Sequence, residues 1–173
     1  VSIFNYCDRW CETCAFTSRC RLFADLARAD AQGDPNMAAV VLAPFDAIAA
    51  TRATKKQVTQ IRDALRAIDT AIAAEQSAVQ EDFAFHRTIA EATNNQHFAD
   101  FLAFLGRHVI PRQIIRVNQS SRQEQQSYLA AIQKDHIAIA DAIGAKNAAG
   151  ARKAMRSHLS KSIDRYRHLV TSP

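Results

Sequence analysis

The sequence is poor in residues that interrupt regular structure, with only four glycines and four prolines among 173 residues. A sandwich or barrel of many short strands needs more turns than these residues supply, so the composition favours helices. No uninterrupted run of about 18 apolar residues occurs, which argues against a membrane-spanning helix. Residues 1–9 have no basic end followed by an apolar core, so no secretory signal is predicted and we expect a cytoplasmic protein.

The apolar residues that are present recur every three or four positions, as one face of a helix requires. The clearest stripe is Val58, Ile61, Leu65, Ile68 and Ile72. Comparable stripes recur along the chain with short connections between them, and no alternating strand pattern is present. We therefore predict an all-α fold over residues 34–170, an antiparallel bundle of six to seven helices.

Polar residues mark the expected helix ends. Thr54 with Gln57, Ser77 with Gln80 and Ser121 with Glu124 have the spacing of capping boxes. The remaining expected boundaries are a start at Asp34-Pro35, a kink or restart at Pro44, left-handed closure at Asn94-Asn95, a bend at Pro111, an end at Gly144 and a cap at Asn147.

Cysteine is absent after residue 20, and the four that exist are close together at Cys7, Cys11, Cys14 and Cys20. With no sign of export, disulfides are not expected, and four close thiolates can surround one metal ion. We interpret residues 1–33 as a short module and linker that binds structural zinc. A [4Fe–4S] cluster and four reduced, unliganded cysteines are the alternatives.

Four metal-ligand side chains fall at inward positions of three predicted helices. Asp82 and His86 are four residues apart, on a side flanked by Phe83. His136 lies in the apolar stripe of the next-to-last helix, and His158 follows Met155 by three in the last. A buried carboxylate without a partner is costly, and a shared divalent cation removes that cost.

Three imidazoles and one carboxylate suit zinc, nickel, manganese or iron, with positions left open for a ligand oxygen. The alternative is that each histidine is an ordinary hydrogen-bonded core residue. The other histidines, His97, His108 and His168, have no such common placement and are predicted to lie at the surface or in packing positions.

Residues about 37–168 resemble the FCD domain, the ligand-binding domain of FadR-type GntR transcription regulators. The stretches EDFAFHRTIAEATNNQHF and KDHIAIADAIGAKNAAGARKAMRSHL carry the resemblance, together with spacings of 50 and 22 residues between the three histidines. The resemblance implies a metal held by Asp82, His86, His136 and His158, and a small organic acid whose carboxylate completes the coordination. The effector-binding candidates are Asn95, which also suits a helix cap, and Arg112 and Arg116 as carboxylate partners, with uninvolved surface cations as the alternative for both arginines.

The resemblance also implies a regulator that binds DNA and forms a homodimer. Phe101 and Phe104 are candidate exposed residues for that dimer. The family places a winged helix-turn-helix before this domain, and the 36 residues that precede it here do not resemble one. We therefore expect DNA contact only through such a domain, which is not visible in this sequence.

The net charge of +5 permits contact with nucleic acid without requiring it. We interpret the densest cluster of basic residues in the sequence as a solvated helix face. Its members are Arg152, Lys153, Arg156, Lys161, Arg165 and Arg167. The functional hypothesis is a metal-dependent effector sensor. The alternatives are a small metalloenzyme acting on an organic acid at the same site, and a structural dimerisation module.

Overall fold

The computed structural model describes the backbone of residues 37–108 and 122–171, and the side chains of residues 43–103, 123 and 126–162. These residues form six helices and no strand, which confirms the all-α prediction. The helices are α2 (Met37–Arg52), α3 (Lys55–Ala73), α4 (Val79–Ala92), α5 (Gln96–His108), α6 (Arg122–Gly144) and α7 (Ala148–Thr171).

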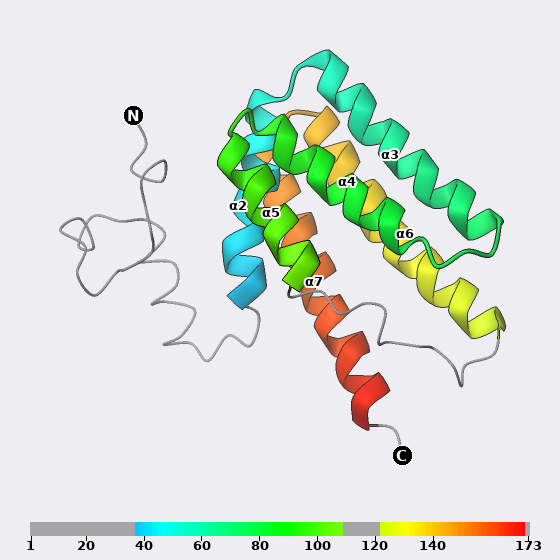
Figure 1. Cartoon of the computed structure of the whole chain (residues 1–173). Coiled ribbons are helices and arrows are strands. Elements are labelled where there is room, and N and C mark those ends of the chain that lie inside the picture. The colour runs from blue at the N-terminus through cyan, green and yellow to red at the C-terminus, as the bar shows by residue number, and fades with distance from the viewer. Residues whose placement is uncertain (1–36, 109–121, 172–173) are drawn as a thin grey trace.

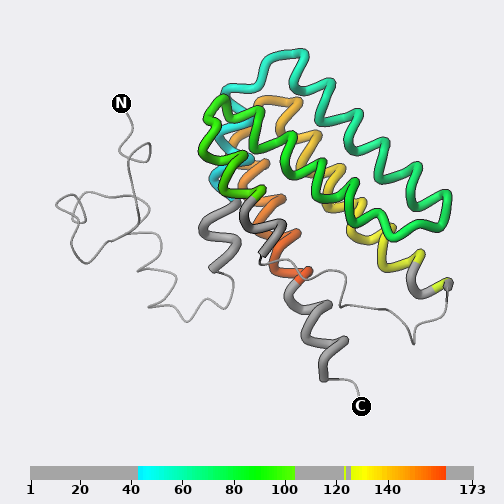
Figure 2. The backbone as a smooth tube through the Cα atoms, in the orientation of Figure 1, coloured from blue at the N-terminus to red at the C-terminus, as the bar shows by residue number. Residues whose placement is uncertain are grey.

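Where the structure describes the connections, neighbouring helices pack antiparallel and are joined by short turns (Figure 1). Helix α4 runs back along α3, and α7 runs back along α6. The two pairs are joined because α6 also contacts α3, while α2 contacts α4, α6 and α7. Figure 2 shows the same path as a tube, with α2 passing close to α7. Helix α2 thus touches every helix that carries one of the predicted metal-binding residues.

The core lies where these helices meet and is built from small and aliphatic side chains. Helix α2 contributes alanines, which allow a close approach to its neighbours, while the larger volume comes from the other helices. Its fully buried large apolar members are Phe85, Ile61, Ile89, Ile139 and Ile143. A smaller cluster of Ala90, Ala99 and Leu102 joins α4 to α5, with Phe83 packed against it.

The capping box at the start of α3 is confirmed. The Thr54 hydroxyl accepts from the Gln57 backbone N–H at 3.2 Å, and the Thr54 N–H donates to the Gln57 side chain at 2.9 Å. The predicted cap at Asn147 is confirmed too, since its side-chain oxygen accepts from the Gly150 N–H at 2.8 Å. Both signals depend on contacts three residues apart, which the sequence alone specifies.

The second predicted capping box is wrong. Helix α4 begins after Ala78, which has a left-handed backbone with φ of 53° and no capping side chain. Ala78 is buried against the core, so the turn from α3 into α4 is set by packing. Ser77 lies exposed outside the helix, and the predicted pairing with Gln80 does not cap it.

Two predicted helix ends, at Asn94 and Gly144, agree with the structure. Asn94 adopts the expected left-handed conformation, with φ of 55°. The predicted end of α6 at Gly144 is confirmed, and the left-handed residue that follows it is Lys146, with φ of 57°. The Lys146 and Asn147 N–H groups donate to the carbonyls of Ile143 and Ala142, which are otherwise left without helical partners.

Pro44 does not restart the first helix. Helix α2 runs without interruption from Met37 to Arg52, although proline removes one backbone donor. The buried alanines around Pro44 pack the helix against α7 and its other neighbours, and this packing outweighs the lost hydrogen bond. Among the described helices, none is long and apolar enough to cross a membrane. The predicted boundaries at Asp34-Pro35, Pro111 and Ser121 lie outside the described residues.

Candidate metal centre

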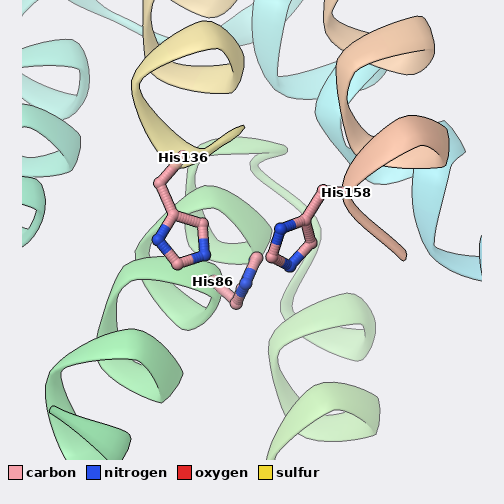
Figure 3. Close-up of side chains that lie close together, drawn as sticks. All are labelled: His86, His136 and His158. Carbon is pink, nitrogen blue, oxygen red and sulfur yellow. The ribbon is translucent and has the colours of Figure 1, made fainter. Parts of the chain in front are cut away.

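Three histidines from three helices converge inside the bundle. His86 comes from α4, His136 from α6 and His158 from α7. Each offers one ring nitrogen to a set in which all three nitrogens lie within 4.8 Å of one another. Figure 3 shows the rings grouped closely, although 50 and 22 residues separate them along the chain. Helix pairing therefore produces the cluster that the inward phasing of each helix predicted.

The three rings differ in their access to solvent. His136 is fully buried, His158 is 2% exposed, and His86 is half-buried. The His136 and His158 ring centroids lie 4.8 Å apart, and that of His86 lies 5.2 and 5.3 Å from them. The cluster is thus closed on the side of α6 and α7 and more open on the side of His86.

Asp82 lies beside the cluster, at its edge. The residue is mostly buried, at 7% exposure, and its Oδ1 is 3.2 Å from His136 Nε2. It is not among the side chains whose ligand atoms all lie within 4.8 Å of one another. The four predicted ligands therefore meet as a close group of three histidines with a carboxylate next to one of them.

The dimensions of the cluster fit a first-row divalent cation. Nitrogens that bind zinc at about 2.0–2.1 Å lie roughly 3.4 Å apart in a tetrahedral site and never more than about 4.2 Å apart. Three donors 4.8 Å apart lie about 2.8 Å from their common centre, so each would move inward by about 0.7 Å to bind zinc at about 2.1 Å. Two of the three rings are buried, and the adjacent carboxylate supplies the negative charge that such a cation favours.

Phe85 supports the cluster from α4, and sequence analysis missed it. The ring is fully buried, with its centroid 4.9 Å from that of His136 and 5.3 Å from that of His86. Sequence analysis placed Phe83 beside the predicted ligands, but Phe83 packs in the smaller cluster near α5. Phe85 precedes His86 and is three residues from Asp82, so helix phasing could have identified it.

A second missed residue, Gln133, contacts His136 directly. Gln133 is 5% exposed, and its side-chain oxygen lies 3.2 Å from His136 Nδ1. Its Nε2 donates to the Leu65 carbonyl at 3.0 Å and to Asp69 Oδ1 at 2.8 Å, both on α3. One residue before His136, Asp135 forms an ion pair with Lys161 of α7, with Nζ and Oδ1 2.6 Å apart. Helix α6 is thus tied to α3 and α7 around its histidine.

A third missed residue, Asp46, is a buried acid on α2. It is 1% exposed, and its Oδ1 has no hydrogen-bond partner among the described residues. Burial raises the pKa of Asp46 well above its ordinary value of 3.8, although a backbone hydrogen bond acts in the opposite direction. Its spacing from the buried Ala43 and Ala50 places it on an apolar stripe, the signal that could have identified it.

The FCD domain model matches residues 46–161, about two thirds of the chain. The chain belongs to the FCD domain family, the domain of GntR-family regulators. This confirms the resemblance, and the matched range includes Asp82 and all three clustered histidines.

One solved structure similar to this FCD domain is the GntR of Streptococcus agalactiae. The two are 16% identical, with a TM-score of 0.57, and share the fold. The match covers 86% of this chain and 62% of that one, so this chain spans less than two thirds of its relative's length. Among curated proteins, no significant match to the chain is found.

The remaining predicted site residues of the FCD domain fall in different places. Asn95 immediately precedes α5, and its side-chain oxygen accepts from the His97 N–H at 3.2 Å, so it caps the start of α5 rather than the end of α4; its effector role stays a prediction. Arg112 and Arg116 lie outside the described residues. So do the four cysteines of the predicted metal module, Cys7, Cys11, Cys14 and Cys20.

The expectation that Phe101 is exposed is wrong. Phe101 is half-buried and meets Phe45 of α2 edge-on, with ring centroids 6.3 Å apart, because α5 folds back against α2. The side chain of Phe104 lies outside the described residues. His97 is exposed, as predicted, while His108 and His168 side chains are not described.

The basic cluster on α7 is exposed where it is described, at Arg152, Lys153, Arg156 and Lys161. Three of these residues line an open groove of about 670 Å³ whose other walls include Ala47 of α2 and the start of α7. None of the three clustered histidines lines this groove. The groove and the histidine cluster of the FCD domain are therefore separate features.

Proposed function

We propose that this FCD domain senses a small organic acid as the effector-binding domain of a GntR-family regulator. In this proposal, His86, His136 and His158 hold a divalent cation, and Asp82 contributes a carboxylate beside it. The single observation that carries the proposal is the convergence of three imidazole nitrogens within 4.8 Å in the interior. Isolated core histidines have no physical reason to gather in this way from three separate helices.

The charges at the cluster favour an acidic effector. Neutral imidazoles leave the charge of a divalent cation uncompensated, and Asp82 offsets only part of it. When bound, such a cation supplies net positive charge and open coordination positions that a carboxylate can occupy. The half-buried His86 leaves the cluster accessible on its own side, while the buried Phe85 ring packs apolar surface against His86 and His136.

The position of the cluster favours a role in signalling. It joins α4, α6 and α7, and all three contact α2, the first described helix. An effector that binds one arrangement of these helices more tightly shifts the population toward that arrangement. We propose that the shift is transmitted across a homodimer to a DNA-binding winged helix-turn-helix domain of the whole regulator.

The test combines metal analysis with titration of acids. The metal-to-chain ratio is measured by elemental analysis for the purified wild type, for His158→Ala and for His97→Ala. His97 is an exposed histidine on α5 and serves as the matched control. The zinc-loaded and metal-free proteins are then titrated calorimetrically with acetate, lactate, malate and citrate.

We expect His158→Ala to lose one metal ion per chain and His97→Ala to lose none. We also expect at least one acid to bind the zinc-loaded wild type at least tenfold more tightly than the metal-free protein. Equal metal content in all three proteins would show that the histidine cluster does not bind the metal. Zinc-independent binding of every acid would overturn the effector role, and turnover of an acid would replace it with an enzymatic one.

A further inference from the structure

We propose that Gln133 is a positioning residue that fixes the tautomer of His136, keeping its proton on Nδ1 and leaving the lone pair of Nε2 facing the histidine cluster. The tautomer follows from the hydrogen bonds around Gln133 alone. The consequence for metal binding rests on the function proposed above.

The orientation of the Gln133 amide is decided by its partners on α3. Its nitrogen lies 3.0 Å from the Leu65 carbonyl and 2.8 Å from Asp69 Oδ1. A carbonyl and a carboxylate can only accept hydrogen bonds, so both require the donating end of the amide. Turning the amide around would place its oxygen against two acceptors, and the orientation is therefore unique.

The orientation of the amide in turn decides which nitrogen of His136 carries the proton. The Gln133 oxygen is left facing His136 Nδ1, at 3.2 Å. That oxygen can only accept, so Nδ1 must be the donor. In the neutral ring, Nε2 is then an unprotonated nitrogen with its lone pair available, which is the form that ligates a metal.

The restraint matters because Asp82 acts on the same ring in the opposite sense. Its Oδ1 lies 3.2 Å from His136 Nε2 and would favour a proton on that nitrogen. A proton on Nε2 would block metal coordination and would have to be displaced. Gln133, buried on the far side of the ring, provides the hydrogen bond that favours the competing tautomer.

The network also has a route to the surface of the protein. Asp69 is exposed on α3, whereas Gln133 and His136 are buried on α6. Leu65 and Asp69 are one helical turn apart on α3, and both accept from the Gln133 amide of α6. This arrangement allows the network to be weakened from outside the core, at Asp69.

The direct test is nitrogen-15 NMR of the histidine side chains in the metal-free full chain. The spectra are recorded near pH 8, because an ordinary histidine, with a pKa of about 6.5, is mostly neutral there. Comparison with His136→Ala identifies the His136 signals. In the wild type we expect a protonated-type shift at Nδ1 and an unprotonated-type shift at Nε2. In Gln133→Leu we expect the pattern to reverse. A wild-type proton on Nε2, or an unchanged pattern in Gln133→Leu, would overturn the proposal.

The second measurement is zinc affinity, determined by competition with a chromophoric chelator. Loss of a residue that orients a metal-binding histidine weakens affinity by about 10–100-fold, which is the range expected for Gln133→Leu. Asp69→Ala should weaken affinity by a smaller factor in the same direction. Its matched control is Asp63→Ala, which removes an exposed carboxylate from the same helix without touching Gln133.

The two measurements separate this inference from the proposed function. If the tautomer is as expected but zinc does not bind, the metal site fails and the role of Gln133 stands. If zinc binds equally tightly to the wild type, Gln133→Leu and Asp69→Ala, the positioning role fails and the metal site stands. The wild-type NMR result requires no variant, so it tests the inference even if Gln133→Leu does not fold.

Discussion

The proposed metal site predicts that replacing His136 with alanine abolishes most of the stabilisation of the FCD domain by zinc. His136 and His158 are both fully buried, and the His136 ring lies close to both other histidines. A cation held by all three rings links α4, α6 and α7, an arrangement that the unfolded chain does not provide. Binding to the folded state alone therefore raises the free energy of unfolding.

The expected size of the effect follows from this linkage. Zinc at 1,000 times its dissociation constant stabilises the folded state by about 4.1 kcal/mol. For a chain of 150–250 residues, each kcal/mol raises the melting temperature by roughly 2–4 °C. The wild type should therefore melt about 8–16 °C higher with zinc than without. At the same zinc concentration, His136→Ala should gain less than about a quarter of that shift.

The assay is differential scanning calorimetry of each protein with and without zinc. Phe85→Leu is the control, because Phe85 is as deeply buried as His136 and touches two of the histidine rings without offering a metal ligand. Phe85→Leu should lower both melting temperatures and keep the difference between them. An equal zinc-induced shift in the wild type and His136→Ala would refute the assignment of the metal to this cluster.

Two further predictions concern stability without metal. Burial raises the pKa of Asp46, so the folded state retains a proton that the unfolded chain releases above about pH 4. Stability should therefore fall as pH rises from the unfolded pKa toward the raised folded pKa. Asp46→Asn should lose less stability than the wild type between pH 4 and 7 in urea titrations, and parallel losses would contradict this. Thr54→Ala should cost about 1 kcal/mol by removing the capping box, measured as a fall in urea midpoint, whereas Thr59→Ala, exposed in the same helix, should cost little.

Several features of the fold could be predicted from the sequence because they depend on neighbours three or four residues apart. The apolar stripe of α3, its capping box at Thr54 and the cap at Asn147 are local, and the structure confirms them. The capping box predicted at Ser77 was wrong because that helix start depends on tertiary contacts rather than on neighbours in the sequence. The buried Ala78 fixes the entry into α4 through contacts with the core, and these outweigh the local preference of a serine.

The sequence by itself determined which side of each helix His86, His136 and His158 occupy, because the helical period fixes the direction of a side chain. Only the tertiary structure decided that the three rings lie together and that Asp82 lies at their edge, because those distances depend on how the helices cross. The proposed role of Gln133 could likewise not be predicted from the sequence. Its partners on α3 are 64 and 68 residues away, and a hydrogen bond over that separation exists only after α3 and α6 have packed.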